Sequence, residues 1–181
     1  MFYDGIVIAI LVALFRGGRF SPFADMNLKK GWVFPILLVF QIMIFSLQNK
    51  YELIGQYSNL SFMVVYVLGL YFLWINRNLP GFNIILFGVF LNFIVMALNG
   101  GRMPVSLEAS TVLDPYYMEA LTNNLYGKHA AITDSTKLAF LGDIIPLSHP
   151  YPKTRVISIG DIVMNIGAFI FIQKIMLSYK K

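Results

Sequence analysis

The chain has 181 residues, of which 57% are hydrophobic and only 13% are charged, and it contains no cysteine. A typical soluble domain carries about 25% charged residues, so this chain has too few charges to cover a water-facing surface. The composition argues against a soluble enzyme, a nucleic-acid-binding protein and a disordered chain, and we expect most of the surface to face lipid. Without cysteine, disulfide bonds, thiolate nucleophiles and iron–sulfur clusters are excluded.

Five apolar segments follow one another along the chain as candidate membrane-spanning helices. A spanning helix needs about 20 mostly apolar residues, with a range of about 17–25. The expected helices cover residues 1–15, 31–48, 53–75, 80–98 and 156–178. The first is short, so it would span by local thinning of the bilayer and by extension of Arg16 to the interface. A signal peptide is the alternative for this segment, but its basic residue follows the apolar run instead of preceding it.

Basic residues in the short connections predict the orientation of these helices. One side carries Arg16, Arg19, Lys29, Lys30, Arg77, Lys174, Lys180 and Lys181, opposed only by Asp25. The long 99–155 segment instead balances its basic residues with acidic ones. Positive charge in short loops stays in the cytoplasm, so the N-terminus is expected outside, the C-terminus inside and residues 99–155 outside. The sequence therefore predicts an all-α integral membrane protein: one domain over 1–181, a five-helix bundle, multi-pass in a bacterial plasma membrane.

The long outer segment is rich in large apolar residues, and loops of this length in compact domains usually carry function. Asp114 and Pro115 predict the start of a helix that Gly127 would close. One side of this helix would carry Tyr116, Tyr117, Ala120, Leu121 and Leu125. That pattern is typical of an amphipathic helix lying at a membrane interface. Thr133 predicts the cap of a second short helix through Leu141, so we expect the segment to form a partly helical lid.

Two Gly-Gly-Arg elements, at residues 17–19 and 100–102, each follow an expected helix. Glycine readily adopts the left-handed conformation that ends helices, so helix capping is the simplest interpretation of both. For the second element a binding role stays open beside the capping role.

Polar side chains fall on single faces of three expected helices. They are Ser158, Asp161 and Asn165 on the last helix, Asn92 and Asn99 with Gly81 and Gly88 on the helix before the long segment, and Gln41 with Gln48 on the second. Polar groups inside a membrane are costly and often functional, although Asn, Gln and small residues also hold membrane helices together. We interpret Asn92, Gln41 and Gln48 as packing residues of this kind.

Asp143 and Asp161 are the candidate catalytic residues. Two carboxylates about 3 Å apart cannot both ionise, so they share one proton and divide the acid and base roles when water attacks a carbonyl. The alternatives are a helix cap or a bridge to Arg155 or Arg102 for Asp161, and a solvated turn for Asp143.

The dyad chemistry requires neither a metal nor a cofactor. The chain has only two histidines, His129 and His149, and they lack the spacing of metal ligands. No serine-nucleophile motif and no phosphate loop is present. We therefore expect no bound metal and no cofactor.

The C-terminal part resembles the type II (lipoprotein) signal peptidases. The resemblance rests on Gly142-Asp143-Ile-Ile and on Val156-Ile-Ser-Ile-Gly-Asp-Ile-Val-Met-Asn-Ile-Gly167. The eighteen positions between the two aspartates are about the separation of that family's catalytic dyad, and Ser158 stands where the family has Asn. Asn99-Gly-Gly-Arg102 resembles the family's Asn-x-x-Asp-Arg without its acid. The resemblance implies a dyad of Asp143 and Asp161, with substrate contacts from Asn99, Arg102, Ser158 and Asn165.

The whole chain looks more like an uncharacterised family of small bacterial membrane proteins that carry Asn-Gly-Gly-Arg-Met-Pro, Leu-Gly-Asp and Ser-Ile-Gly-Asp segments. That membership implies no activity. Three functions therefore stay open. The first is an intramembrane aspartyl hydrolase, peptidase-like, acting at the outer leaflet on a membrane-anchored peptide or lipoprotein. The alternative is a non-catalytic subunit or scaffold that binds lipids or a partner membrane protein. The third is a small transporter or quinone-binding protein, for which five helices are few.

Overall fold

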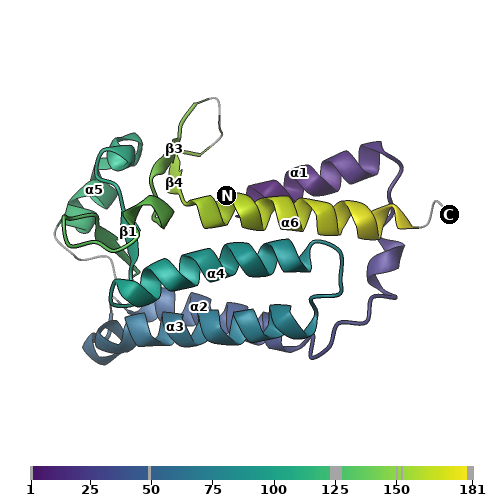
Figure 1. Ribbon diagram of the computed structural model, residues 1–181, viewed down its shortest axis with the longest axis horizontal. Coiled ribbons are helices and arrows are strands. Elements are labelled where there is room, and N and C mark those ends of the chain that lie inside the picture. The colour runs from purple at the N-terminus through teal and green to yellow at the C-terminus, as the bar shows by residue number, and fades with distance from the viewer. Residues whose placement is uncertain (1, 49, 123–127, 150, 152, 179–181) are drawn as a thin grey trace.

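The computed structural model describes residues 2–48, 50–122, 128–149, 151 and 153–178. Within these residues the protein is mostly helical. The long helices are α1 (Phe2–Phe15), α2 (Val33–Leu47), α3 (Glu52–Ile75), α4 (Phe82–Leu98) and α6 (Ile159–Met176). They run side by side, and the short strands gather at one end of them (Figure 1).

The five long helices occupy the expected helical ranges to within a few residues at either end. The largest difference is at the start of α6. Residues Arg155–Ile157 are paired as strand β4, and Ser158 has the extended backbone of an N-cap, so the helix begins only at Ile159.

The expectation of an all-α protein is wrong for residues 99–155, which form two small sheets together with residues 156 and 157. Because residues 99–155 were expected outside the membrane, we call them the outer segment. The strands of the two sheets are β1 (Met103–Val105), β2 (His129–Ala131), β3 (Ile145–Leu147) and β4 (Arg155–Ile157). β1 pairs in parallel with β2, and β3 pairs antiparallel with β4, with Ile145 opposite Ile157. Each strand is only three residues long, which is too short for a period of two to stand out in the sequence.

Of the two short helices expected in the outer segment, the first is present. Helix α5 (Pro115–Thr122) begins where the Asp114 carboxylate accepts a hydrogen bond of 2.9 Å from the Tyr116 amide. Tyr116 is exposed while Leu121 is buried, so the expected common face is divided. The Ala120 side chain, Leu125 and Gly127 lie outside the described residues.

The prediction of a second helix from Thr133 to Leu141 is wrong. The Thr133 amide donates to the Thr136 hydroxyl at 2.9 Å and so closes a turn. Leu138 then takes a left-handed conformation, with φ of 51°, which interrupts any helical backbone. Only a short 3₁₀ turn, η3 (Ala139–Leu141), follows. Two further 3₁₀ turns are η1 (Ser21–Phe23) and η2 (Ala109–Val112).

The helices form a row in the order α1, α6, α4, α3 and α2, as the principal helix contacts show. Helices α6 and α4 therefore stand in the middle of the row (Figure 1). Among the described residues, α4 and α6 bury more than the other long helices do, and the buried face of α4 meets α6 on one side. Helices α2 and α3, at one edge of the row, leave many large apolar side chains exposed, for example Phe34, Val39 and Leu53.

Glycines set the distance between α4 and α6. A Cβ atom on Gly88 would lie 2.7 Å from the carbonyl oxygen of Gly160, and one on Gly167 would lie 2.7 Å from the Ile85 amide. Gly81, with φ of 79°, likewise faces the Gly167 backbone. Small residues allow the backbones of membrane helices to approach in this way. The face that carries Gly81, Gly88 and Asn92 is thus the face that packs on α6.

Helix α1 packs on the other side of α6 by the same device. Its Ala9 and Ala13 are fully buried, and the Gln173 amide of α6 donates to the Ala9 carbonyl at 2.7 Å. At the end of α1, Arg16 donates to the Gln173 side chain at 2.7 Å. Gln173, which was not among the predicted polar residues, therefore ties α1 to α6.

The α4–α6 contact generates a stability prediction. We expect Gly88→Ala to lower the melting temperature in detergent micelles by several degrees, because the new methyl group meets the backbone of α6, and overpacking of this kind costs roughly 1–3 kcal/mol. Gly69→Ala in α3 is the matched control, since nothing lies within 4 Å of its added Cβ. The control should be neutral or slightly stabilising. A Gly88→Ala protein as stable as the wild type would contradict the close contact.

Candidate functional site

Both Gly-Gly-Arg elements are helix caps. Gly17, at φ of 80°, and Gly18 close α1, and the Gly18 amide donates to the Ala13 carbonyl at 2.8 Å. Gly100 and Gly101 close α4 with the equivalent bond, from the Gly101 amide to the Met96 carbonyl at 2.8 Å. This is the bond pattern of a Schellman cap.

Asn99, predicted to contact substrate, joins α4 to the outer segment. Its side-chain amide donates to the carbonyls of Val95 at 2.7 Å and Lys137 at 2.8 Å, and its oxygen accepts from the Lys137 amide at 3.0 Å. Arg102 follows directly after the cap and is half-buried. Two of these three bonds hold residue 137 against the end of α4.

Asn92 connects α4 to the first turn of α6. Its amide group donates to the Asp161 carboxylate at 3.1 Å, and its oxygen accepts from the Ser158 hydroxyl at 2.9 Å. Asn92 and Ser158 are almost completely buried, at 2% and 0% exposure. The packing role predicted for Asn92 is thus also a positioning role, because the side chain orients both polar groups at the start of α6.

Ser158 and Asp161 form a capping box at the start of α6. The Asp161 amide donates to the Ser158 hydroxyl at 3.0 Å, and the Ser158 amide donates to the Asp161 carboxylate at 3.3 Å. This exchange satisfies two amides that the helix start would leave unpaired. The cap that the sequence offered as an alternative role for Asp161 is therefore present, and it holds the carboxylate in one orientation.

Asp143 is fixed by its backbone in a buried position. Its amide donates to the Pro104 carbonyl at 2.8 Å, and its carbonyl accepts from the Ser106 amide at 2.9 Å. The residue is only 8% exposed, so the alternative of a solvated turn acid is wrong. One carboxyl oxygen lies 3.7 Å from Nε2 of His129, and the other is buried without a hydrogen-bond partner among the described residues.

The β3–β4 hairpin brings Asp143 toward the start of α6. Ile144 donates to the Ile157 carbonyl at 3.2 Å, so the residue after Asp143 is bonded to the residue before Ser158. The Asp161 carboxylate is close enough to act electrostatically on Asp143. The two acids singled out in the sequence thus belong to one polar cluster, which we call the acid cluster and define as Tyr66, Asn92, Lys128, His129, Asp143, Ser158 and Asp161.

Three members of the acid cluster were not predicted from the sequence. Tyr66 comes from α3 and lies within electrostatic reach of Lys128 and both aspartates. Lys128 directly precedes β2, and His129 is its first residue. Their positions depend on the parallel pairing of Met103 with His129. A signal for Tyr66 was present, since it lies seven positions before Leu73 on the inner face of α3, but a tyrosine in an apolar helix does not stand out.

Burial sets the charge states of Asp143 and His129, whose side chains are in contact. It raises the pKa of Asp143 to about 8, with help from the negative charge of Asp161 and against the positive charge of Lys128. Burial, followed by the charge of Lys128, lowers the pKa of His129 to about 3. Near neutral pH the Asp143–His129 contact therefore joins a protonated acid to a neutral imidazole, and it is not an ion pair.

Lys128 supplies the positive charge of the cluster. The Tyr66 oxygen raises the pKa of Lys128 above its ordinary value, and Asp143 and Asp161 act in the same direction against the effect of burial. The ammonium group therefore stays charged at neutral pH beside the two acids.

The remaining predicted residue, Asn165, lies one turn beyond Asp161. Its amide donates to the Asp161 carbonyl at 2.8 Å, and its oxygen is buried without a hydrogen-bond partner among the described residues. A Cβ atom on Gly5 of α1 would collide with this side chain. His149 is exposed and outside the cluster. Within the described part of the chain, no group of three or more His, Asp or Glu residues comes together that could hold a metal ion.

The chain belongs to a family of unknown function (DUF5317), whose sequence model matches residues 25–173. It is 35% identical over 171 residues to an uncharacterized protein of Thermotoga maritima, and the match covers 94% of this chain and 89% of that protein. No solved structure matches the chain at a significant level. The expected membership in an uncharacterised family is confirmed, and these comparisons do not show a relationship to the type II signal peptidases.

The pKa shifts of Asp143 and His129, caused mainly by burial, predict how stability depends on pH. Between pH 3.8 and about 8 the folded state keeps a proton on Asp143 that the unfolded chain loses, so this group makes the free energy of unfolding fall as pH rises. Between about pH 3 and 6.5 the unfolded chain protonates His129 and the folded state does not, so this group makes it rise. Each slope is about 1.4 kcal/mol per pH unit, and the two cancel where they overlap.

Thermal unfolding at several pH values tests this balance. The Asp143→Asn variant should lose the decline in stability between pH 6.5 and about 8 and should show a rise between pH 3.8 and 6.5. The His129→Gln variant should show a decline over the whole window from pH 3.8 to about 8. His149→Gln is the matched control and should keep the wild-type profile. A decline above pH 6.5 that persists in Asp143→Asn would contradict the buried, protonated acid.

Proposed function

We propose that the protein spans a membrane several times, with the acid cluster near the outer surface. Two helices, Leu53–Ile75 and Ile159–Met176, are long and apolar enough to cross a bilayer. Only 28% and 33% of their apolar windows are buried inside the protein. Large contiguous apolar surfaces of this kind favour contact with lipid. The shorter α1, α2 and α4 fit a locally thinned bilayer.

The distribution of charge supports one orientation in that membrane. The connection from Arg16 to Lys30, the turn at Arg77 and the end of α6 all lie at the end of the helices opposite to the strands (Figure 1). This end carries most of the basic residues in short connections, which favours the cytoplasm. The outer segment, the N-terminus and the acid cluster would then face outward, in a bacterial plasma membrane.

The absence of cysteine from the sequence makes the orientation directly measurable. In intact cells, a membrane-impermeant maleimide should label Asp134→Cys, which is exposed in the outer segment. It should label Asp25→Cys, exposed at the basic end, only after the membrane is permeabilised. Labelling of both variants in intact cells, or the reverse pattern, would contradict the proposed placement. The unmodified cysteine-free chain is the background control.

Within this membrane placement we propose that the protein is an aspartyl hydrolase, peptidase-like, acting on a membrane-anchored peptide or lipoprotein. The observation that carries the proposal is a pair of acids in different states: Asp143 is buried with its pKa raised to about 8, and Asp161 is a carboxylate held by hydrogen bonds from Asn92 and Ser158. Two acids whose environments differ in this way can divide acid and base catalysis between them.

The chemistry assigns one role to each acid. Asp161 takes a proton from a water molecule as the water oxygen attacks the substrate carbonyl, and Asp143 gives its proton to the carbonyl oxygen. When the tetrahedral intermediate collapses, Asp161 passes the proton from the water to the leaving amine, and Asp143 takes back a proton from a hydroxyl of the intermediate. The Lys128 ammonium offsets the negative charge that collects in the cluster. Arg102 at the end of α4 would contact the substrate, while Asn99 holds residue 137 against that helix end. The outer segment would limit the access of bulk water as a lid does.

A non-catalytic scaffold that binds lipids or a partner membrane protein is the second candidate. It is favoured by the capping box, because the Asp161 carboxylate already has a structural role at the start of α6. In that case the acid cluster would serve only to join the outer segment to the helix row. The two candidates differ in what happens when the acids are neutralised without a change of shape.

Comparison of new peptide termini in the membrane fraction separates the two candidates without knowledge of the substrate. Host cells that lack the protein are complemented with wild type, Asp143→Asn, Asp161→Asn or the exposed control Asp134→Asn. The hydrolase predicts termini that appear with wild type and control and fall at least about 100-fold with either dyad variant, as expected when a general acid or base is removed. Immunoblots and melting temperatures check abundance and folding. Full activity in a folded dyad variant, or no dependent termini at all, would overturn the hydrolase.

A further inference from the structure

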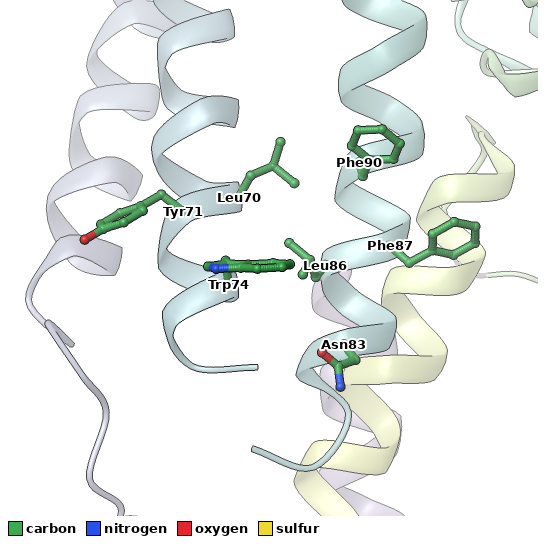
Figure 2. A pocket seen from close by; sticks show the side chains of 7 residues that line it. All are labelled: Leu70, Tyr71, Trp74, Asn83, Leu86, Phe87 and Phe90. Carbon is green, nitrogen blue, oxygen red and sulfur yellow. The ribbon is translucent and has the colours of Figure 1, made fainter. Parts of the chain in front are cut away.

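An apolar groove lies between α3 and α4, and its lining shares no residue with the acid cluster. It has a volume of about 460 Å³, within the range of small-molecule sites. It is lined by Leu70, Tyr71, Trp74, Asn83, Leu86, Phe87 and Phe90. The Trp74 ring reaches from α3 toward α4 at the level of Leu86, and Asn83 lies nearer the turn that joins the two helices (Figure 2). The groove is thus a row of apolar side chains with one polar residue near its turn end.

Two cations pack on aromatic side chains of the groove lining. The Arg77 guanidinium lies 4.0 Å from the centre of the Trp74 ring. Lys30 lies 5.2 Å from the Tyr71 ring centre and donates to the Tyr71 hydroxyl at 3.1 Å. Tyr71 points to the side of α3 away from α4 (Figure 2), so its partner Lys30 lies at the margin of the groove, whereas Arg77 packs on Trp74, a lining residue that reaches toward α4. Arg77 on the Trp74 ring and Asn83 in the lining supply a cation and an amide group that suit an anion.

The backbone around Lys30 is held in an uncommon conformation. Lys30 has φ of 53°, which is unfavourable for a residue with a side chain. The preceding residue, Lys29, is fixed through two hydrogen bonds with the Asn76 side chain, of 2.9 and 3.0 Å. Asn76 itself is buried at the end of α3. The structure therefore holds Lys30 beside Tyr71 instead of leaving it to move with a free loop.

We propose that this groove binds an anionic phospholipid of the inner leaflet, with an acyl chain along Leu70, Leu86 and Phe90 and the phosphate at Arg77 and Asn83. The inference rests on the membrane placement proposed above and is independent of the hydrolase. An apolar groove with an arginine packed on its tryptophan complements a molecule that has an apolar chain and an anionic head. Basic pockets between membrane helices on the cytoplasmic side recognise anionic lipids in this manner.

Tryptophan quenching by brominated lipids tests the proposal, because Trp74 lines the groove. In a Trp32→Phe background, Trp74 is the one remaining tryptophan of the sequence. The protein is reconstituted with phosphatidylglycerol or phosphatidylcholine brominated on the acyl chains, and the signal is normalised to the same lipid without bromine. We expect a roughly tenfold higher relative affinity for the anionic lipid, as two nearby cations provide.

The matched variants decide whether the preference comes from the groove. Arg77→Gln should reduce the preference severalfold and Lys30→Gln less. Lys174→Gln removes an exposed charge from the last turn of α6, at the same end of the helix row, and should leave the preference unchanged. Equal quenching by both lipids, or an unchanged preference in Arg77→Gln, would overturn the proposal. Absence of quenching together with a dimeric mass would assign the groove to a second copy of the chain and would also overturn it. The hydrolase test changes other residues, so its failure is visible separately.

Discussion

The close approach of α4 and α6 is the contact on which the rest of the structure depends. Gly88 against Gly160, and Gly81 against Gly167, remove the side chains that would hold the two backbones apart. Only at this separation can the short Asn92 side chain bond both Ser158 and Asp161. Because α4 and α6 also stand in the middle of the helix row, a wider spacing there would displace α1 on one side and α3 on the other. The packing of the helices and the geometry of the acid cluster therefore both depend on the short distance between α4 and α6.

The acid cluster combines costly burial with specific support. A buried carboxyl group without hydrogen bonds is expensive, and the protein meets that cost by keeping Asp143 protonated, not by pairing it. Asp161 is treated in the opposite way, with donors placed on both of its oxygens. A purely structural site has no need of this difference, since an apolar residue at position 143 would pack without penalty. The asymmetry between the two acids is what favours a chemical role.

Sequence reasoning was most successful where a pattern is local. Long apolar segments located the five long helices, and the spacing of Gly81, Gly88 and Asn92 identified the face of α4 that packs on α6. It failed for very short elements, namely the three-residue strands of the outer segment and the turn at Leu138. It also missed Lys128 and His129, which reach the cluster only because β2 pairs with the remote strand β1. The likeness of the two aspartates to a peptidase dyad located the cluster, but the family match carries no activity.

The most direct measurement of the central claim is the titration of Asp143 itself by infrared spectroscopy of the purified protein in lipid. The account predicts a carbonyl band of a protonated carboxylic acid at neutral pH that disappears with a midpoint near pH 8, matching the pKa of about 8 given to Asp143 by burial and Asp161. The band should be missing from Asp143→Asn, and its midpoint should fall in Asp161→Asn as a negative neighbour is removed. A wild-type protein whose carboxyl bands have all vanished by pH 6 would contradict the account.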